Sequence, residues 1–268
     1  MKKTRNNHTD TSWDGVARWY SGWSGATGSV YHRKTVIPAV MDLLGCRSDE
    51  RVLDVGCGPG AVSRHITDTG AEYVGVDLSV RMIAFARRSN GGRRRQFFQA
   101  DAVRLGENRH LRDRAFDAAI FLLSIQDMNP LEAVVRQVRA HLSMRGRIVI
   151  LMTHPCFRIP RQSGWGWDSG RKLHYRRIDR YLQTLNVPMQ PHDDGGGITR
   201  SYHRPLSDYV NAIADAGMTL DAMKEIPEPS RPPGRGTGGI RRNGDIPLFL
   251  GFRAVVAGHK PASVRGQR

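Results

Sequence analysis

The sequence predicts an α/β protein whose core is a doubly wound, mostly parallel sheet. In residues 51–152 short apolar segments alternate with helical segments, an order that produces crossover connections and a sheet covered on both faces. Glycines and aspartates follow several of the apolar segments directly, at the strand ends where open parallel sheets bind ligands. The chain has 268 residues, 39% of them hydrophobic and 25% charged, which is the composition of a globular protein with a sizeable core.

The first regular element is a helix expected at residues 36–44, where apolar side chains recur at helical spacing and Gly45 suits the end. An aromatic stretch that is rich in Gly and Ser precedes it at residues 13–31. The alternating part that follows predicts buried strands and amphipathic helices in turn. The strands are expected at 51–55, 72–76, 95–99, 116–123 and 147–152, and the helices at 61–69, 80–89 and 131–142.

The alternation stops after residue 152. Residues 153–200 contain no long periodic segment, although tryptophans, tyrosines and arginines are frequent there. Regular patterns return with a helix expected at 205–216 and two strands expected at 218–226 and 246–256, which bring the sheet to seven strands. A Pro/Gly-rich run at 227–239 predicts a flexible loop between those two strands.

These patterns predict a single domain at residues 13–257, with a cap inserted at about 153–204 after the fifth strand. The polar ends, 1–12 and 258–268, are expected to be disordered. No apolar run approaches the ~20 residues that a membrane span needs, and the start of the chain lacks the apolar core of a signal peptide. The expected location is therefore the cytoplasm, with no membrane partner.

Cysteine and charge patterns exclude some functions and leave others open. Three cysteines without a CxxC pair support neither a disulfide framework nor a zinc site, and no metal is expected. The net charge of +16 is compatible with binding nucleic acid. Only six of the 41 basic residues are lysines, however, and the arginines are scattered along the whole chain. Local clusters such as Arg93-Arg94-Arg95 therefore fit either a solvated face or an anion-binding surface.

A glycine-rich loop, VLDVGCGPG at residues 52–60, follows the first predicted strand. Gly56, Gly58 and Gly60 allow a tight turn with positive φ, and they let a ligand approach the backbone closely. A helix is expected to begin near Ala61. The spacing Gly56-x-Gly58-x-x-Ala61 also fits a dinucleotide fingerprint, so the loop alone does not identify the nucleoside ligand.

Two aspartates follow the next two strands. Asp77 ends the second strand, where its carboxylate can accept both hydroxyls of a ribose; the alternative is a helix N-cap. Asp101 follows the third strand, where its carboxylate and the amide of Ala102 can bind an adenine. Three consecutive strands thus present ligand groups at their carboxyl ends, and a nicotinamide cofactor would leave Asp101 and Ala102 without a role.

With these motifs in order, the sequence resembles the class I S-adenosylmethionine-dependent methyltransferases of the small-molecule type. The resemblance covers about residues 13–155 well and 202–256 moderately, and includes FDAAIFLLSIQDM around the fourth strand. It implies a Rossmann-like seven-stranded sheet with a C-terminal antiparallel hairpin. It also implies S-adenosylmethionine as cofactor and S-adenosylhomocysteine as product. The cofactor-binding residues that it implies are Tyr20 (as a lid), Asp54 (orienting the loop), Gly56, Gly58, Gly60, Asp77, Leu78, Asp101, Ala102 and Leu123 beside the sulfonium.

Methyl transfer needs alignment, a dry site and, for some acceptors, a base near the ends of the fourth and fifth strands. His154 directly follows the fifth strand, and its ordinary pKa of ~6.5 suits a base; the alternative is a histidine that fixes its loop. Substrate contacts are expected from polar and aromatic residues after the fourth strand and in or near the cap, whose aromatics could equally hold a loose loop together. These residues are Gln126, Arg158, Trp165, Tyr181 and His203.

The expected acceptor is a small molecule, planar or anionic, with oxygen or nitrogen favoured over carbon as the methylated atom. Nucleic acid is less favoured, since Asn129-Pro130-Leu131 falls short of the NPPY-like tetrapeptide of amino-methylating DNA enzymes. Two alternatives remain open: methylation of RNA or another macromolecule, and cleavage or cyclisation of S-adenosylmethionine itself. The protein is expected to be a monomer or a homodimer.

Overall fold

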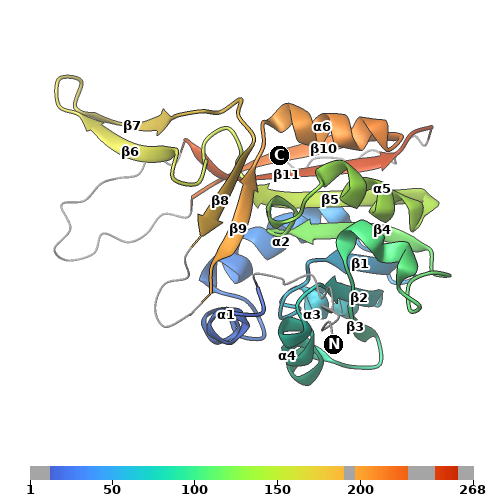
Figure 1. Cartoon of the computed structure of the whole chain (residues 1–268). Coiled ribbons are helices and arrows are strands. Elements are labelled where there is room, and N and C mark those ends of the chain that lie inside the picture. Colours follow the sequence, from blue (N-terminus) through green and yellow to red (C-terminus); the bar gives the residue numbers. More distant parts are fainter. Residues whose placement is uncertain (1–12, 190–196, 229–244, 259–268) are drawn as a thin grey trace, which may run out of the picture.

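Seven strands form the central sheet of the computed structural model, which describes residues 13–189, 197–228 and 245–258 (Figure 1). Their order is β10-β11-β5-β4-β1-β2-β3. Strands β1 to β5 are parallel to one another, whereas β11 is antiparallel to both β5 and β10, as predicted. The strands are β1 (Arg51–Val55), β2 (Glu72–Asp77), β3 (Arg95–Gln99), β4 (Phe116–Leu122), β5 (Leu142–Thr153), β10 (Met218–Pro227) and β11 (Pro247–Val256).

The strand order reverses between β1 and β4. The chain runs outward from β1 through β2 to β3, and then returns to the other side of β1 to form β4 and β5. The loops that leave β1 and β4 therefore diverge, and open sheets bind ligands in the crevice that such divergence creates. The glycine loop leaves β1 at this point, so the topology places the predicted ligand-binding motifs at the switch of strand order.

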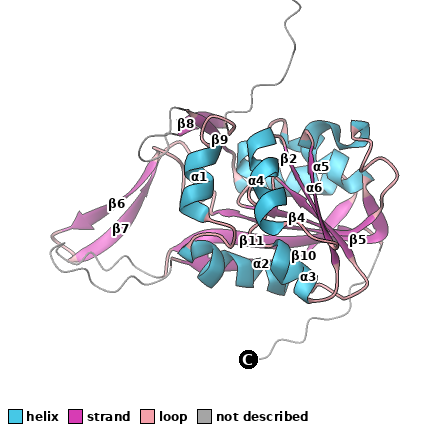
Figure 2. Ribbon diagram, turned by 90° about the horizontal axis from the view of Figure 1, so that it is seen from below, coloured by secondary structure: helices cyan, strands magenta, loops and turns pink. Residues whose placement is uncertain are grey.

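Helices cover both faces of the sheet (Figure 2). Alternate residues of each strand contribute to opposite cores: the paired Val52 and Tyr73 belong to one cluster, and the paired Leu53 and Val74 to the other. Because both faces are buried, these strands are almost continuously apolar. The first cluster includes residues of α2 (Ile37–Leu44), α3 (Ser63–Asp68) and α4 (Val80–Asn90), and the second those of α5 (Leu131–Ala140) and α6 (Leu206–Asp215).

A buried ion pair links the start of β1 to β5. Glu50 is only 2% exposed, and its two carboxylate oxygens accept hydrogen bonds from the Arg147 guanidinium at 2.6 and 2.9 Å. The Arg147 Nε–H group also donates to the carbonyl oxygen of Leu44, at the end of α2. Burial alone would raise the pKa of Glu50, but the hydrogen bonds and charge of Arg147 outweigh it, so the pKa is lowered.

The N-terminal segment contains a helix where only an aromatic stretch was expected. This helix, α1 (Ala17–Ser24), contacts α4, and the Ser21 hydroxyl lies 3.9 Å from the sulfur of Met82. Its Gly and Ser residues are weak helix formers, so the helix depends on these tertiary contacts. A π-helical turn, η1 (His32–Val36), precedes α2, and Gly45 ends α2 with a φ of 52° as expected.

The segment between β5 and α6 is more regular than its sequence suggested. It forms two antiparallel pairs outside the main sheet: β6 (Ser163–Asp168) with β7 (Leu173–Ile178), and β8 (Leu185–Met189) with β9 (Thr199–His203). The sequence shows no long periodic segment here because these strands are short, and β6 and β7 have little buried surface and so lack a strong hydrophobic pattern. Figures 1 and 2 both show the β6–β7 hairpin projecting away from the main sheet.

Three sequence-based expectations lie largely or wholly outside the described residues: the disordered ends at 1–12 and 258–268 (apart from Gly258), and most of the Pro/Gly-rich loop at 227–239. Within the three described ranges, none of the helices has the length and apolar character required to cross a membrane.

Candidate active site

A cavity of about 370 Å³ opens at the carboxyl ends of β1, β2, β3 and β4. Its volume falls within the range of ligand pockets, roughly 300–1,000 Å³. Helix α1 and strand β9 also contribute to its wall. Nine of the ten predicted cofactor-binding residues line it: Tyr20, Asp54, Gly56, Gly58, Asp77, Leu78, Asp101, Ala102 and Leu123.

The three glycines of the loop have positive φ angles of 73°, 50° and 78°, but each serves a different purpose. A Cβ on Gly56 would lie 2.6 Å from the Cβ of Ser124, so this glycine lets the turn after β4 approach the loop. A Cβ on Gly58 would meet only the ring of Tyr20, at 3.9 Å, so its surroundings are open. A Cβ on Gly60 would lie 2.6 Å from the Phe97 ring, which makes Gly60 a packing position rather than a cavity residue.

Asp77 connects the end of β2 to the glycine loop. Its carboxylate accepts hydrogen bonds from the backbone N–H groups of Gly58 and Ser79, both at 2.9 Å. The N-cap of α4 is Ser79, whose hydroxyl oxygen accepts from the N–H of Met82, so Asp77 is not the cap. Burial raises the pKa of Asp77, and the two backbone hydrogen bonds oppose this rise. The carboxylate therefore holds the loop in place while it lines the cavity.

Asp54 has one bonded and one free carboxylate oxygen. Oδ2 accepts a hydrogen bond from the Tyr73 hydroxyl at 2.6 Å, whereas Oδ1 is buried and has no hydrogen-bond partner among the described residues. Burial raises the pKa of Asp54 to about 7; the Tyr73 hydrogen bond opposes the rise, and the negative charge of Asp77 adds to it. The hydrogen bonds of the loop run instead from the N–H groups of Gly56 and Cys57 to the Val76 carbonyl oxygen.

The ends of β3 and β4 complete the cofactor half of the cavity. Asp101 caps the 3₁₀-helix η2 (Ala102–Glu107), because its Oδ1 accepts from the N–H of Val103 at 3.1 Å. Leu123 has a φ of 57°, a conformation that is uncommon outside glycine and redirects the chain after β4. The next residue, Ser124, donates its hydroxyl to the Val55 carbonyl oxygen at 2.6 Å, which ties this turn to the end of β1.

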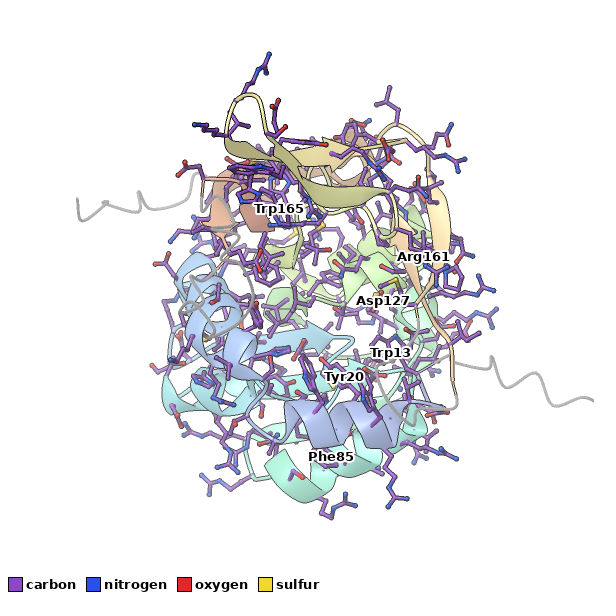
Figure 3. All side chains as sticks on the ribbon, turned by 90° about the vertical axis from the view of Figure 1, so that its left-hand side faces the viewer. Trp13, Tyr20, Phe85, Asp127, Arg161 and Trp165 are labelled. Atoms are coloured by element: carbon purple, nitrogen blue, oxygen red, sulfur yellow. The ribbon has the colours of Figure 1, made fainter. Side chains whose placement is uncertain are left out.

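The lining of the cavity also includes aromatic residues and one further carboxylate, Asp127. Tyr20 lies edge-on to Trp13, with ring centroids 5.3 Å apart, and both line the cavity. Burial, followed by the charge of Asp127, raises the pKa of Tyr20 to about 12. Figure 3 shows Trp13, Tyr20 and Asp127 in the middle of the molecule. Asp127 was not among the residues predicted from the sequence, although its neighbour Gln126 was.

Arg200 and Tyr202, on β9, also line the cavity and were missed. A signal for them was present, because a strand places alternate residues on one side. Along β9, Thr199, Ser201 and His203 are buried, whereas Arg200 and Tyr202 are not. Recognising 199–203 as a strand would have placed Arg200 and Tyr202 on a common face.

His154, the predicted base, does not line this cavity. It is 2% exposed, its Nδ1 accepts from the N–H of Cys156 at 3.2 Å, and its Nε2 lies 3.0 Å from Oε1 of Glu225. Both ring nitrogens are therefore used within the protein. Burial lowers the pKa of His154, and Glu225 opposes this effect. The geometry favours the alternative role, a histidine that fixes the loop after β5.

The five predicted substrate-binding residues lie outside the main cavity. Gln126, Arg158 and His203 surround a second, much smaller cavity of about 20 Å³. Gln126 accepts hydrogen bonds from the backbone and hydroxyl of Thr153, both at 3.2 Å, so it joins the end of β4 to β5.

The remaining two belong to the cap segment. The Arg158 and Arg176 guanidinium groups lie 5.6 and 5.5 Å from the centre of the Trp165 ring, and Figure 3 shows Trp165 well away from Tyr20. The Tyr181 hydroxyl accepts from the N–H of Leu206 at 3.0 Å. These contacts are those of aromatic residues that hold the cap segment together.

The cysteines and the possible metal ligands of the described residues bear on two further predictions. Cys46, Cys57 and Cys156 are free thiols, and burial raises the pKa of Cys57 well above its usual value. No group of three or more His, Cys, Asp and Glu side chains in those residues could hold a metal ion.

Comparison with known proteins gives matches to methyltransferases. Residues 52–146 match the family of the methyltransferase domain. The demethylmenaquinone methyltransferase of Tropheryma whipplei (strain Twist) is 32% identical over 119 residues, 44% of this chain and 48% of that protein. The N-demethylindolmycin N-methyltransferase of Streptomyces griseus is 24% identical over 194 residues, 68% of this chain and 75% of that protein. The chain thus spans about half the length of the first of these relatives.

The fold has solved counterparts. A crystal structure of an S-adenosylmethionine-dependent methyltransferase from Mesorhizobium loti superposes with a TM-score of 0.65 and 25% sequence identity. The match covers 86% of this chain and all of that one. It therefore extends the likeness well beyond the residues of the methyltransferase domain match.

The cavity itself fits S-adenosylmethionine, a nucleoside that carries a cationic sulfur and an amino acid group. The free Oδ1 of Asp54 can accept a hydrogen bond from a ligand, and the open space beside Gly58 admits one close to the backbone. Burial raises the pKa values of two carboxyls in the wall, Asp54 and Asp77, and a cationic ligand would stabilise their ionised forms. Domain match, fold and cavity agree: residues 52–146 match the methyltransferase domain, and the chain has the fold of S-adenosylmethionine-dependent methyltransferases.

Proposed function

We propose that this chain transfers the methyl group of S-adenosylmethionine to a nitrogen or oxygen atom of a small, planar acceptor. One observation carries the proposal. A single cavity joins the glycine loop, Asp77 and Asp101 to a wall that contains Trp13 and Tyr20. Aromatic side chains suit a flat acceptor. Two relatives are named as methyltransferases of demethylmenaquinone and of N-demethylindolmycin, and these names support a small-molecule substrate.

The residues of the cavity divide the task of binding. The carboxylate of Asp77 would accept the ribose hydroxyls, while Asp101 and the amide of Ala102 would bind the adenine. The backbone around Gly58 and the free oxygen of Asp54 would hold the amino acid end. When bound, the cofactor supplies a methyl group activated by a cationic sulfur. The protein's own contribution is to align this group with the acceptor and to keep water out.

The hydrogen bonds of His154 favour a structural role, and the catalytic role predicted for it can be tested by mutation. If His154 is a base, His154→Ala lowers kcat strongly and leaves the affinity for S-adenosylhomocysteine unchanged. If it only fixes the loop, the variant loses stability while kcat per folded molecule changes little. The two outcomes are separated by measuring kcat alongside a urea unfolding curve.

The proposed function is tested in two stages. Isothermal calorimetry with S-adenosylmethionine and S-adenosylhomocysteine should show binding of both at one site per chain. Incubation with S-adenosylmethionine and a series of flat hydroxyl and amino compounds should then form S-adenosylhomocysteine only when acceptor is present. A product without acceptor would instead indicate cleavage or cyclisation of the cofactor. Salt-sensitive methylation of RNA would favour a macromolecular substrate.

A further inference from the structure

Asp127 is a carboxylate of the cavity for which cofactor binding provides no role. It ends the 3₁₀-helix η3 (Ile125–Asp127), which directly follows the turn after β4. The N–H of Asp127 donates to the carbonyl oxygen of Ser124 at 3.0 Å, and Ser124 is bonded in turn to Val55 at the end of β1. Gly56 lacks the side chain that would push this turn away. Asp127 is thus held at a fixed position beside the glycine loop.

Groups from several elements face Asp127. Ser201, on β9, gives its carboxyl a hydrogen bond, and the charge of Asp77 acts on it from the end of β2. The negative charge of Asp127 raises the pKa values of Tyr20, on α1, and of Tyr209, on α6.

Arginines are also present in this region. Arg204 donates hydrogen bonds to the Met128 carbonyl oxygen at 2.8 Å and to Oδ1 of Asn129 at 3.0 Å, and it is hydrogen-bonded to Tyr209. Arg200 and Tyr202 line the same cavity.

These surroundings leave the Asp127 carboxyl able to take up a proton near neutral pH. Burial and the negative charge of Asp77 raise its pKa to about 8, and the Ser201 hydrogen bond opposes this rise. A carboxyl with such a pKa lies close to the optimum for exchanging protons at the operating pH. The aromatic residues Trp13, Tyr20 and Tyr202 line the same cavity. A flat molecule that lies between them can direct a polar hydrogen at the carboxylate.

We propose that Asp127 accepts the proton of the methyl acceptor, and that the acceptor is therefore an aromatic or other planar compound with a nucleophilic N–H or O–H group. This proposal rests on the proposed methyltransferase function. The lone pair of the acceptor nitrogen or oxygen forms the bond to the methyl carbon. The bond between that carbon and sulfur breaks, and its electron pair remains on sulfur. The proton of the acceptor passes to the Asp127 carboxylate, so no oxidant or reductant is required.

A binding experiment tests the contact directly. The carboxyl carbon of Asp127 is followed by ¹³C NMR in protein saturated with S-adenosylhomocysteine, and assigned by its loss in Asp127→Asn. Two probes are added: 1-naphthol, which has an O–H group, and 1-methoxynaphthalene, which has the same ring without it. We expect 1-naphthol to shift the pKa of Asp127 and the ether to leave it unchanged. Equal effects of the two probes, or no effect of either, would overturn the proposal.

A kinetic experiment tests the proton transfer, with 1-naphthol and 1-aminonaphthalene as acceptors. For wild type, kcat/KM should rise with pH up to about 8, because only the ionised carboxylate accepts a proton. Asp127→Asn should lower kcat/KM by about 100-fold or more and abolish this pH dependence. Its affinity for S-adenosylhomocysteine should change less than about threefold, or ~0.7 kcal/mol.

The matched control is Asp113→Asn, an exposed aspartate in the loop before β4 that should leave every measurement unchanged. An Asp127→Asn variant with the wild-type pH profile refutes the proposal, as does a protein that binds S-adenosylmethionine but methylates neither probe. Failure to bind S-adenosylmethionine at all would refute the proposed function instead. The two failures are thereby distinguished.

Discussion

Replacing Asp77 by asparagine tests the cofactor site most directly. Asparagine has nearly the same shape, but only its carbonyl oxygen can accept a hydrogen bond. In the native protein the two carboxylate oxygens accept from the N–H groups of Gly58 and Ser79, each at 2.9 Å. The variant can satisfy one of these groups and leaves the other without its acceptor, which destabilises the loop by about 1–3 kcal/mol.

The effect on ligand binding follows from the same atoms. Hydrogen bonds to a charged group contribute about 1.5–3 kcal/mol, so losing the charge should weaken binding of S-adenosylhomocysteine about 10- to 150-fold. A compensating effect acts on neighbouring carboxyls. Because the charge of Asp77 raises the pKa values of Asp54 and Asp127, both values should fall in the variant.

Isothermal calorimetry of wild type, Asp77→Asn and the exposed control Asp113→Asn measures the dissociation constants. Carboxyl ¹³C titration of the same proteins measures the two neighbouring pKa values. The reasoning is refuted if the dissociation constant of Asp77→Asn stays within threefold of wild type while both neighbouring pKa values fall. Asp77 would then lie in the cavity without holding the ligand.

Three further predictions concern stability and are measured by urea unfolding. Gly60→Ala combines a φ of 78° with a Cβ only 2.6 Å from the Phe97 ring, and should lose about 2–4 kcal/mol; a loss below 1 kcal/mol would contradict this packing. Folding raises the pKa of Asp54 from 3.8 to about 7, so its contribution to stability falls as pH rises between these values. The side chain of Asp54→Asn stays neutral, so the stability of this variant relative to wild type should increase between pH 5 and 7.5. A stability difference that is constant with pH would be evidence against the raised pKa of Asp54. Arg147→Ala leaves Arg47, at 3.0 Å, as the remaining charged partner of the buried Glu50 carboxylate and should cost about 1–3 kcal/mol; a loss below about 0.5 kcal/mol would show that Arg147 is dispensable there.

Local sequence patterns were sufficient to predict most of the sheet. The bounds predicted for β1 and β3 agree with the structure, and those of β2 and β4 differ by one residue. Strands buried on both faces are continuous apolar runs that end at glycine or polar residues, so a short window of sequence contains the whole signal. Helix α1 and the four strands between β5 and α6 lacked such a signal. Their stability comes from contacts with distant residues, such as the one between Ser21 and Met82.

The candidate site divides in the same way. Parallel strands bring their carboxyl ends to one edge, so the residues after β1, β2 and β3 had to converge, and Asp54, Asp77 and Asp101 could be placed from sequence. No such rule places the other residues of the cavity, such as Asp127, Arg200 and Tyr202. Gln126 and Asp127 are neighbours, yet Gln126 bonds to Thr153 while Asp127 lines the cavity.

The sequence alone therefore determined the seven strands of the mostly parallel sheet and most of the glycines and aspartates near the strand ends that line the cavity. Only the tertiary structure decided that His154 turns toward Glu225 and that β9 brings Arg200 and Tyr202 to the cavity. The physical reason is the range of the interactions. Strand ends and glycine turns are governed by neighbours in the chain, whereas the direction of a side chain in a loop depends on hydrogen bonds to residues that are distant in sequence.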